Sequence, residues 1–68
     1  MSEKVFKQIT MTGCSTESYE KAIEAAVEKA SESLRGLAWF EVTAFRGGIR
    51  PDGGLEYQAT LNVAFKVD

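Results

Sequence analysis

The stretch LEYQATLNVAFKV, Leu55 to Val67, carries the clearest structural signal of the chain. Its odd-numbered positions are all apolar or aromatic, whereas nearly all its even-numbered positions are polar. Such alternation is typical of a strand with one buried face, because neighbouring side chains of a strand point to opposite sides of the sheet. At about 3.3 Å per residue this strand spans roughly 40 Å. It outreaches the single helix, of roughly 27 Å at about 1.5 Å per residue, that the chain predicts upstream.

The segment before this stretch forms a hairpin with it. Residues 37–49, LAWFEVTAFRGGI, predict the second strand, and the pair Gly47 and Gly48 predicts a bend or bulge in it. Between the two strands lies RPDGG, residues 50–54. A turn is predicted here because the proline presets its φ, the aspartate bonds its own backbone, and the two glycines accept positive φ.

The first half of the chain predicts a strand followed by a helix. The strand covers KVFKQITMT, residues 4–12, and Gly13 predicts its end. Ser15 or Thr16 then caps a helix that closes at Gly36. The charged side of this helix is expected to be an ordinary solvated surface. Its apolar side faces the core and recurs every three or four residues, at Tyr19, Ala22, Ile23, Ala26, Val27, Ala30 and Leu34.

These elements predict one α+β domain over residues 1–68, with the order β-α-β-β. The strand at 55–67 has the cleanest apolar face and is expected in the centre, flanked by the strands at 4–12 and 37–49. The result is a three-stranded antiparallel sheet of order 1-3-2, with the helix as a right-handed crossover on one face. The polar second face and the two long edges favour pairing with other subunits.

Composition narrows the class of protein further. A chain of 68 residues buries only about 60% of its unfolded surface alone, and with one cysteine and no histidine neither a disulfide nor a thiol or imidazole metal site is expected to stabilise it. Oligomerisation is therefore expected. A net charge of −2 without a basic block disfavours nucleic acid or an anionic membrane as partner. The polar start, with no apolar run near about 18 residues, predicts a cytoplasmic protein.

Trp39, the only tryptophan, adjoins Phe40 inside the second strand. Phe40, Val42 and Ala44 share one parity, which we assign to the core. Trp39 then lies on the opposite face, the face that carries Gln58. Two interpretations stay open: the indole fills a subunit interface, or it stacks on a planar ligand whose ring edge bonds the amide of Gln58.

Nearly the whole chain resembles the dodecins, a family of small flavin-binding proteins. The match follows the family's order and spacing through VFKQITMTGCSTES, YEKAIEAAVEKA, LAWFEV, FRGGI and EYQATLNVAFKV. The resemblance implies a subunit whose sheet wraps around its helix, and a hollow homo-dodecamer with flavins stacked in pairs at its twofold axes. Each isoalloxazine ring would lie between an indole and a glutamine pair, and Trp39 and Gln58 stand at the matching positions.

The resemblance is to the bacterial branch of the family, which looks adapted to FMN. Arg46 matches the arginine of this branch and Lys66 matches another basic position, so both are expected to contact the phosphate. Arg46 as an intersubunit salt-bridge partner and Lys66 as a solvated charge stay open. Gly48 and Ala44 stand where some members carry polar side chains near the sugar-alcohol tail. Recognition of that tail would then rest on backbone groups, and riboflavin is an alternative ligand. Coenzyme A has also been associated with bacterial members.

The sequence contains no catalytic constellation. Cys14 lacks a second thiol and is expected to be a small packed residue, while Glu41 and Glu56 are expected to be solvated or interfacial charges. A clamped flavin leaves no room for a substrate, so no enzyme is expected. We expect a protein that sequesters and stores FMN or riboflavin, with an indole that quenches the excited ring and limits photochemical damage. The alternative is an oligomeric structural or adaptor module that binds no flavin, with Trp39 in an interface.

Overall fold

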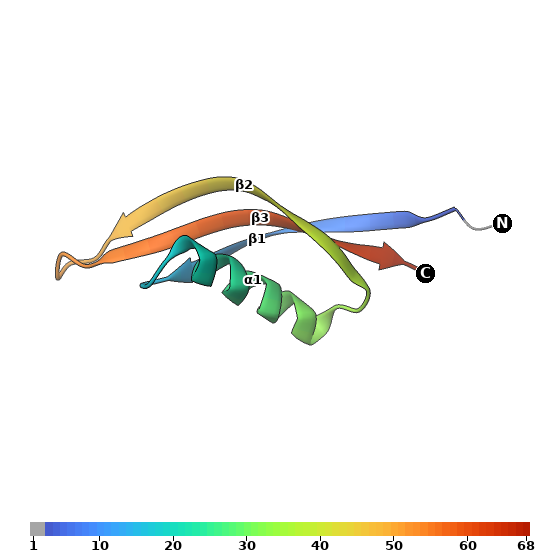
Figure 1. The fold of residues 1–68 in the computed structure, drawn as a ribbon, viewed down its shortest axis with the longest axis horizontal. Helices are drawn as coiled ribbons and strands as arrows, with labels where there is room; N and C mark the ends of the chain where they lie inside the picture. The colour runs from blue at the N-terminus through green and yellow to red at the C-terminus, as the bar shows by residue number, and fades with distance from the viewer. Residues whose placement is uncertain (1–2) are drawn as a thin grey trace.

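The protein forms a strand, a helix and a long two-stranded hairpin. The computed structural model describes residues 3–68 (Figure 1). Its elements are β1 (Val5–Ser15), α1 (Tyr19–Ser33), β2 (Leu37–Ile49) and β3 (Leu55–Val67). Figure 1 shows a curved sheet with the helix lying along one of its faces. The predicted β-α-β-β order and the predicted bounds of the second and third strands are confirmed.

The most strongly alternating strand, β3, lies in the centre of the sheet. The strand order is β1-β3-β2, and both pairings are antiparallel. Val5 lies opposite Val67 at one end of the sheet, and Ile49 lies opposite Leu55 where the hairpin closes. The predicted order 1-3-2 is therefore confirmed. Because β1 and β2 occupy opposite edges, α1 must cross over the sheet to connect them.

The turn between β2 and β3 is held by its own backbone and by one aspartate. Oδ1 of Asp52 accepts a hydrogen bond from the Gly54 amide at 2.8 Å, and the Arg50 amide donates to the Gly54 carbonyl at 2.8 Å. Gly53 has a φ of 89°, which favours glycine. The expected turn is confirmed, although only the first of its two glycines takes a positive φ.

A bend or bulge in β2 was expected at Gly47 and Gly48, but the irregularities of this strand lie earlier in the sequence. Its register shifts between Leu37 and Trp39 and again between Val42 and Ala44. An extra residue in one strand reverses the alternation of every side chain beyond it. Ala44 therefore joins the face away from the helix, and Phe45 takes its place on the helix side. The assignment of Ala44 to the core parity was wrong for this reason.

Gly13 does not end the first strand, as the sequence suggested, but lies within it. β1 runs on to Ser15. A Cβ atom at Gly13 would collide with the backbone carbonyl of Ala22 and lie 3.1 Å from the Cβ of Ala26. The glycine is needed because the strand and the helix touch backbone to backbone at this point.

The helix begins later and ends earlier than predicted. Its N-cap is Ser18, whose Oγ accepts from the Lys21 amide at 3.1 Å. Ser15 accepts from backbone amides of the preceding turn instead, and Thr16 does not cap the helix. The helix stops at Ser33, before Gly36, whose φ of 72° turns the chain into β2. No helix within residues 3–68 is long and apolar enough to cross a membrane.

The core is a thin layer between α1 and the middle of the sheet. Its helix side consists of alanines, which let the helix approach the sheet closely. Its sheet side comes from alternate residues of β3. The buried set is Ala22, Ala26, Ala30, Ala59, Leu61 and Val63.

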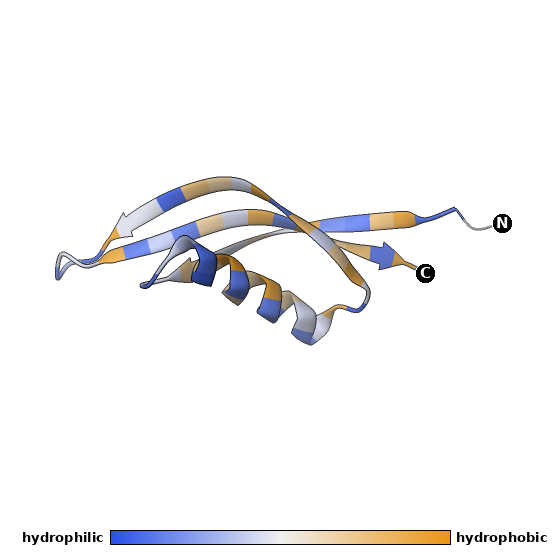
Figure 2. Cartoon of the chain, in the orientation of Figure 1, coloured by the Kyte–Doolittle hydropathy of each residue, from blue (hydrophilic) through white to orange (hydrophobic). Residues whose placement is uncertain are grey.

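The sheet extends well beyond the helix, as its greater predicted length implied. The protomer measures 56 × 21 × 15 Å along its principal axes, and Figure 2 shows hydrophobic positions at the strand ends beyond the helix. Ile49 is 82% exposed and Val5 is 62% exposed. Apolar side chains this exposed at both ends of a small protomer favour contacts with further copies.

Candidate functional site

The sheet has an outer face, which we define by the even-numbered residues of β3 and their partners, on the side away from α1. Trp39 lies opposite Ala64, and Arg46 lies opposite Gln58. Gly48 lies opposite a glutamate of the same parity, and Lys66 belongs to the same row of β3. The structure therefore places all five residues that the sequence singled out as cofactor-binding on this one face.

Within one protomer, however, these residues form two separate groups. Trp39 and Lys66 lie toward the chain termini, and Arg46, Gly48 and Gln58 lie toward the hairpin turn. Because Ala64 and Gln58 are six positions apart on β3, the indole and the amide are separated by about 20 Å. A single protomer therefore does not bring Trp39 and Gln58 against the same ring. A ring held between an indole and a glutamine needs side chains from more than one copy.

At the tryptophan end, two aromatic rings meet across the sheet. The centroids of Phe6 and Trp39 are 4.8 Å apart, with ring planes inclined by 57°. Trp39 nevertheless remains 45% exposed, so much of the indole is free for a further contact. Sequence reasoning missed Phe6. The pairing follows from the register, which sets Phe6 opposite Lys66, two positions along β3 from the partner of Trp39.

At the glutamine end, a chain of hydrogen bonds orients the amide of Gln58. Nε of Arg46 donates to Oε1 of Gln58 at 2.6 Å, and Nε2 of Gln58 donates to Oε1 of Glu56 at 2.8 Å. The amide keeps one further acceptor position and one further donor hydrogen. A Cβ at Gly48 would lie 3.4 Å from Nε2 of Gln58, so the glycine leaves this side of the amide uncovered. Glu56 was expected to be a solvated or interfacial charge; its contact with Gln58 was not foreseen.

Between the two ends, the outer face carries hydroxyl and amide groups. Thr10 donates to Oδ1 of Asn62 at 2.7 Å, and the hydroxyls of Thr12 and Thr60 are 3.0 Å apart. In each pair the two side chains contact each other through a hydrogen bond. The pairs form a polar segment of the outer face, between the aromatic end and the glutamine end.

Cys14 also lies on the outer face, opposite Gln58. It is a free and exposed cysteine, so the expectation that it is packed was wrong. The cause is the continuation of β1 through Gly13, which keeps the strand alternation and turns the next side chain outward. Among the described residues, no group of three or more acidic, cysteine or histidine side chains is placed to hold a metal ion.

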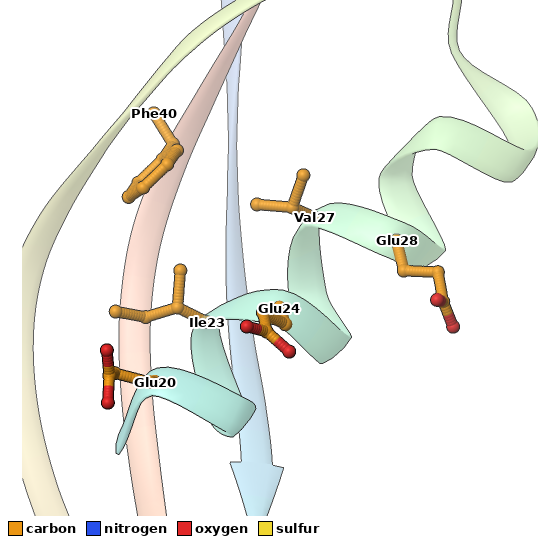
Figure 3. A pocket seen from close by; sticks show the side chains of 6 residues that line it. All are labelled: Glu20, Ile23, Glu24, Val27, Glu28 and Phe40. Carbon is orange, nitrogen blue, oxygen red and sulfur yellow. The ribbon is translucent and has the colours of Figure 1, made fainter. Parts of the chain in front are cut away.

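The opposite side of the sheet has a groove between α1 and β2 (Figure 3). Ile23, Val27 and Phe40 form its apolar floor, and three glutamates of α1 line it. Phe40 is 48% exposed there. The groove lies apart from the residues of the outer face.

This geometry defines a class of protein: a small α+β chain whose outer sheet face carries an aromatic end and a glutamine end. The family model for dodecins matches residues 5–68, and the chain belongs to the dodecin family. It is 45% identical to a dodecin of Thermus thermophilus over 65 residues, which is 96% of this chain and 94% of that one.

Solved structures agree with this assignment. A tryptophan-to-phenylalanine variant of the Thermus thermophilus dodecin matches with a TM-score of 0.89 at 42% identity, covering 97% of this chain and 98% of that one. The dodecin from Streptomyces davaonensis matches with a TM-score of 0.90 at 31% identity, covering 98% of each chain. At the level of the family, dodecins are small flavin-binding proteins that form dodecamers.

Proposed function

We propose that this chain assembles into a hollow dodecamer that sequesters and stores FMN, with riboflavin as a second ligand. The observation that carries this proposal is the separation of Trp39 from Gln58 on one face. Both side chains present groups suited to a flavin ring, yet about 20 Å of strand lies between them. A twofold axis that apposes two outer faces would bring the tryptophan end of one copy to the glutamine end of another, and would repeat each contact.

The two ends supply complementary contacts to an isoalloxazine. The half-exposed indole of Trp39 offers a broad face for stacking. The oriented amide of Gln58 has one free donor hydrogen and one free acceptor position for the ring edge. Gly48 leaves room beside that amide, so the sugar-alcohol tail would pass along backbone groups here.

The phosphate of FMN would be held by the basic residues of the same face. Lys66 adjoins the tryptophan end in the register of β3, and Arg46 lies at the glutamine end. Arg46 uses its Nε for Gln58, which leaves the terminal nitrogens of the guanidinium for an anion. A phosphate contact at either residue would favour FMN over riboflavin.

The mode of binding that we propose is storage without turnover. A ring stacked on an indole and on a second flavin has no open face over its reactive centre for a substrate. The indole would quench the bound flavin by donating an electron to its excited ring, and the return of that electron would restore both groups. The bound flavin would therefore be non-fluorescent and protected from photochemical damage.

A titration tests the proposal. Flavin-free protein is added to FMN and to riboflavin while flavin fluorescence is followed, on material whose mass is measured by light scattering. We expect quenching that saturates near one flavin per chain, on a particle of about twelve chains. The matched variant Gln58→Ala should bind more weakly on a particle of unchanged mass.

The second candidate function is an oligomeric structural or adaptor module without a flavin. The exposed apolar residues at the ends of the sheet favour assembly whether or not a ligand binds. A particle of about twelve chains that binds neither FMN nor riboflavin would select this function and reject storage.

A further inference from the structure

Phe6 and Trp39 reach one another from the two opposite edges of the sheet. Phe6 belongs to β1 and Trp39 to β2, and β3 lies between these strands. Their ring centroids are 4.8 Å apart and their planes are inclined by 57°. The contact therefore closes over the central strand, and it fixes one side of the indole.

The residue between the two rings is unusually small and unusually buried for its face. Ala64 lies opposite Trp39 on β3 and is 0% exposed, although it points away from α1 and does not belong to the helix-side core. Its partner on β1 is Gln8, two positions from Phe6, so both rings lie next to Ala64 in the register of the sheet. All other even-numbered residues of β3 are polar. Ala64 is therefore the one small apolar residue of β3 on the outer face, and its methyl group leaves space for two rings to meet above it.

We propose that Phe6 is a positioning residue for Trp39: it holds the indole in the plane on which the ligand ring stacks. The proposal rests on the proposed flavin function. An exposed indole without such support samples several rotamers, and binding must then restrict it at a cost in affinity. Phe6 removes that freedom in advance, while the indole keeps 45% of its surface exposed.

The test compares two substitutions of Phe6 with one matched control. Phe6→Leu removes the ring and keeps an apolar side chain, whereas Phe6→Tyr keeps the ring. Phe45→Leu removes a ring from the helix side of the sheet, where Phe45 packs on Tyr19 at a centroid distance of 4.9 Å. Because Trp39 is the only tryptophan, the indole band in near-ultraviolet circular dichroism reports its surroundings in the flavin-free protein.

We expect Phe6→Leu to lose most of the indole band and to bind FMN about threefold to tenfold more weakly, with particle mass unchanged. Phe6→Tyr and Phe45→Leu should keep the native band and stay within about twofold of the native affinity. A native band and native affinity in Phe6→Leu would overturn the proposal, and so would a Phe6→Tyr variant that behaves as Phe6→Leu does.

Ala64→Val provides a second route if Phe6→Leu does not assemble. It keeps both rings but places a larger side chain between them, so the indole band should change as in Phe6→Leu. A native band in Ala64→Val would contradict the arrangement. The two proposals fail differently, since absence of flavin binding by the native protein rejects flavin storage, while the indole band tests the support of Trp39 without any ligand.

Discussion

Arg46 donates from Nε to Oε1 of Gln58 at 2.6 Å. This relationship gives the arginine a role at the amide that is independent of any phosphate. Glu56 accepts a hydrogen bond from Nε2 of Gln58 at 2.8 Å. The oxygen and the nitrogen of the amide therefore each have one partner, and these two bonds fix the directions of the remaining acceptor position and donor hydrogen. Arg46 therefore combines two functions that substitutions can separate: it orients the amide, and it offers positive charge to an anion.

Arg46→Ala is expected to weaken FMN binding about tenfold and riboflavin binding about threefold. Loss of the donor frees the amide and affects both ligands, whereas loss of the charge affects only the phosphorylated one. Parallel fluorescence titrations with the two flavins measure the difference. Arg50→Ala is the control, because that arginine lies in the turn and contacts Asp52 at 3.5 Å. Unchanged riboflavin affinity would show that Arg46 does not act through Gln58.

Lys66→Gln is expected to lower FMN affinity about threefold and to leave riboflavin affinity unchanged, since an exposed ammonium acts on the phosphate through charge alone. The difference between native and variant protein should shrink as salt is added. Isothermal titration at two salt concentrations measures both effects. Lys21→Gln, on the exposed side of α1 beside Glu24, is the matched substitution and should change neither affinity. Equal losses for the two flavins would contradict a phosphate contact at Lys66.

Trp39→Phe should keep FMN affinity within about tenfold of the native value, because a smaller ring still stacks. The bound flavin should nevertheless become brighter, since phenylalanine is a poorer electron donor than tryptophan. Fluorescence lifetimes of the bound flavin distinguish loss of quenching from loss of binding. An unchanged lifetime in the Trp39→Phe variant would refute quenching by the indole.

Gly13→Ala should destabilise the protein by about 1–3 kcal/mol, as overpacking of a closed contact does. The added Cβ meets the carbonyl of Ala22, and neither the strand nor the helix backbone moves cheaply. Thermal unfolding at fixed protein concentration measures the change, because assembly makes Tm concentration-dependent. Gly47→Ala is the control, since a Cβ there lies 3.6 Å from the nearest atom, the Glu56 carbonyl oxygen. Equal Tm values for the two variants would contradict the backbone contact at Gly13.

The hairpin was predictable from the sequence because its signals are local. Alternation in β3 and the turn chemistry of Arg50–Gly54 define both strands, and the bounds of β2 and β3 agree with those predictions. The end of β1 and the start of α1 were not predictable in the same way. Gly13 suggests a break when it is considered alone, but its role is a close approach to Ala22, which belongs to the next element, α1.

The five candidate site residues were identifiable from their types and from the family resemblance, and they do share one face. Their grouping was not identifiable, because it depends on strand register. The register shift before Ala44 restores Arg46 to the face of Gln58, although simple counting from Trp39 would place Arg46 on the opposite side. Phe6 was missed for the same reason: its contact with Trp39 depends on the register of β1 and β2 against β3, and the residues around Phe6 contain no signal for that register.

The sequence by itself determined the β-α-β-β order, the central place of β3 and the outward position of Trp39. Alternation and turn chemistry act between neighbours along the chain, so a single sequence contains them. Only the tertiary structure decided that Trp39 meets Phe6, that Gln58 is oriented by Arg46, and that the two ends lie about 20 Å apart. Those facts follow from which residue lies opposite which across three strands, and bulges alter that pairing without leaving a clear signal in the sequence.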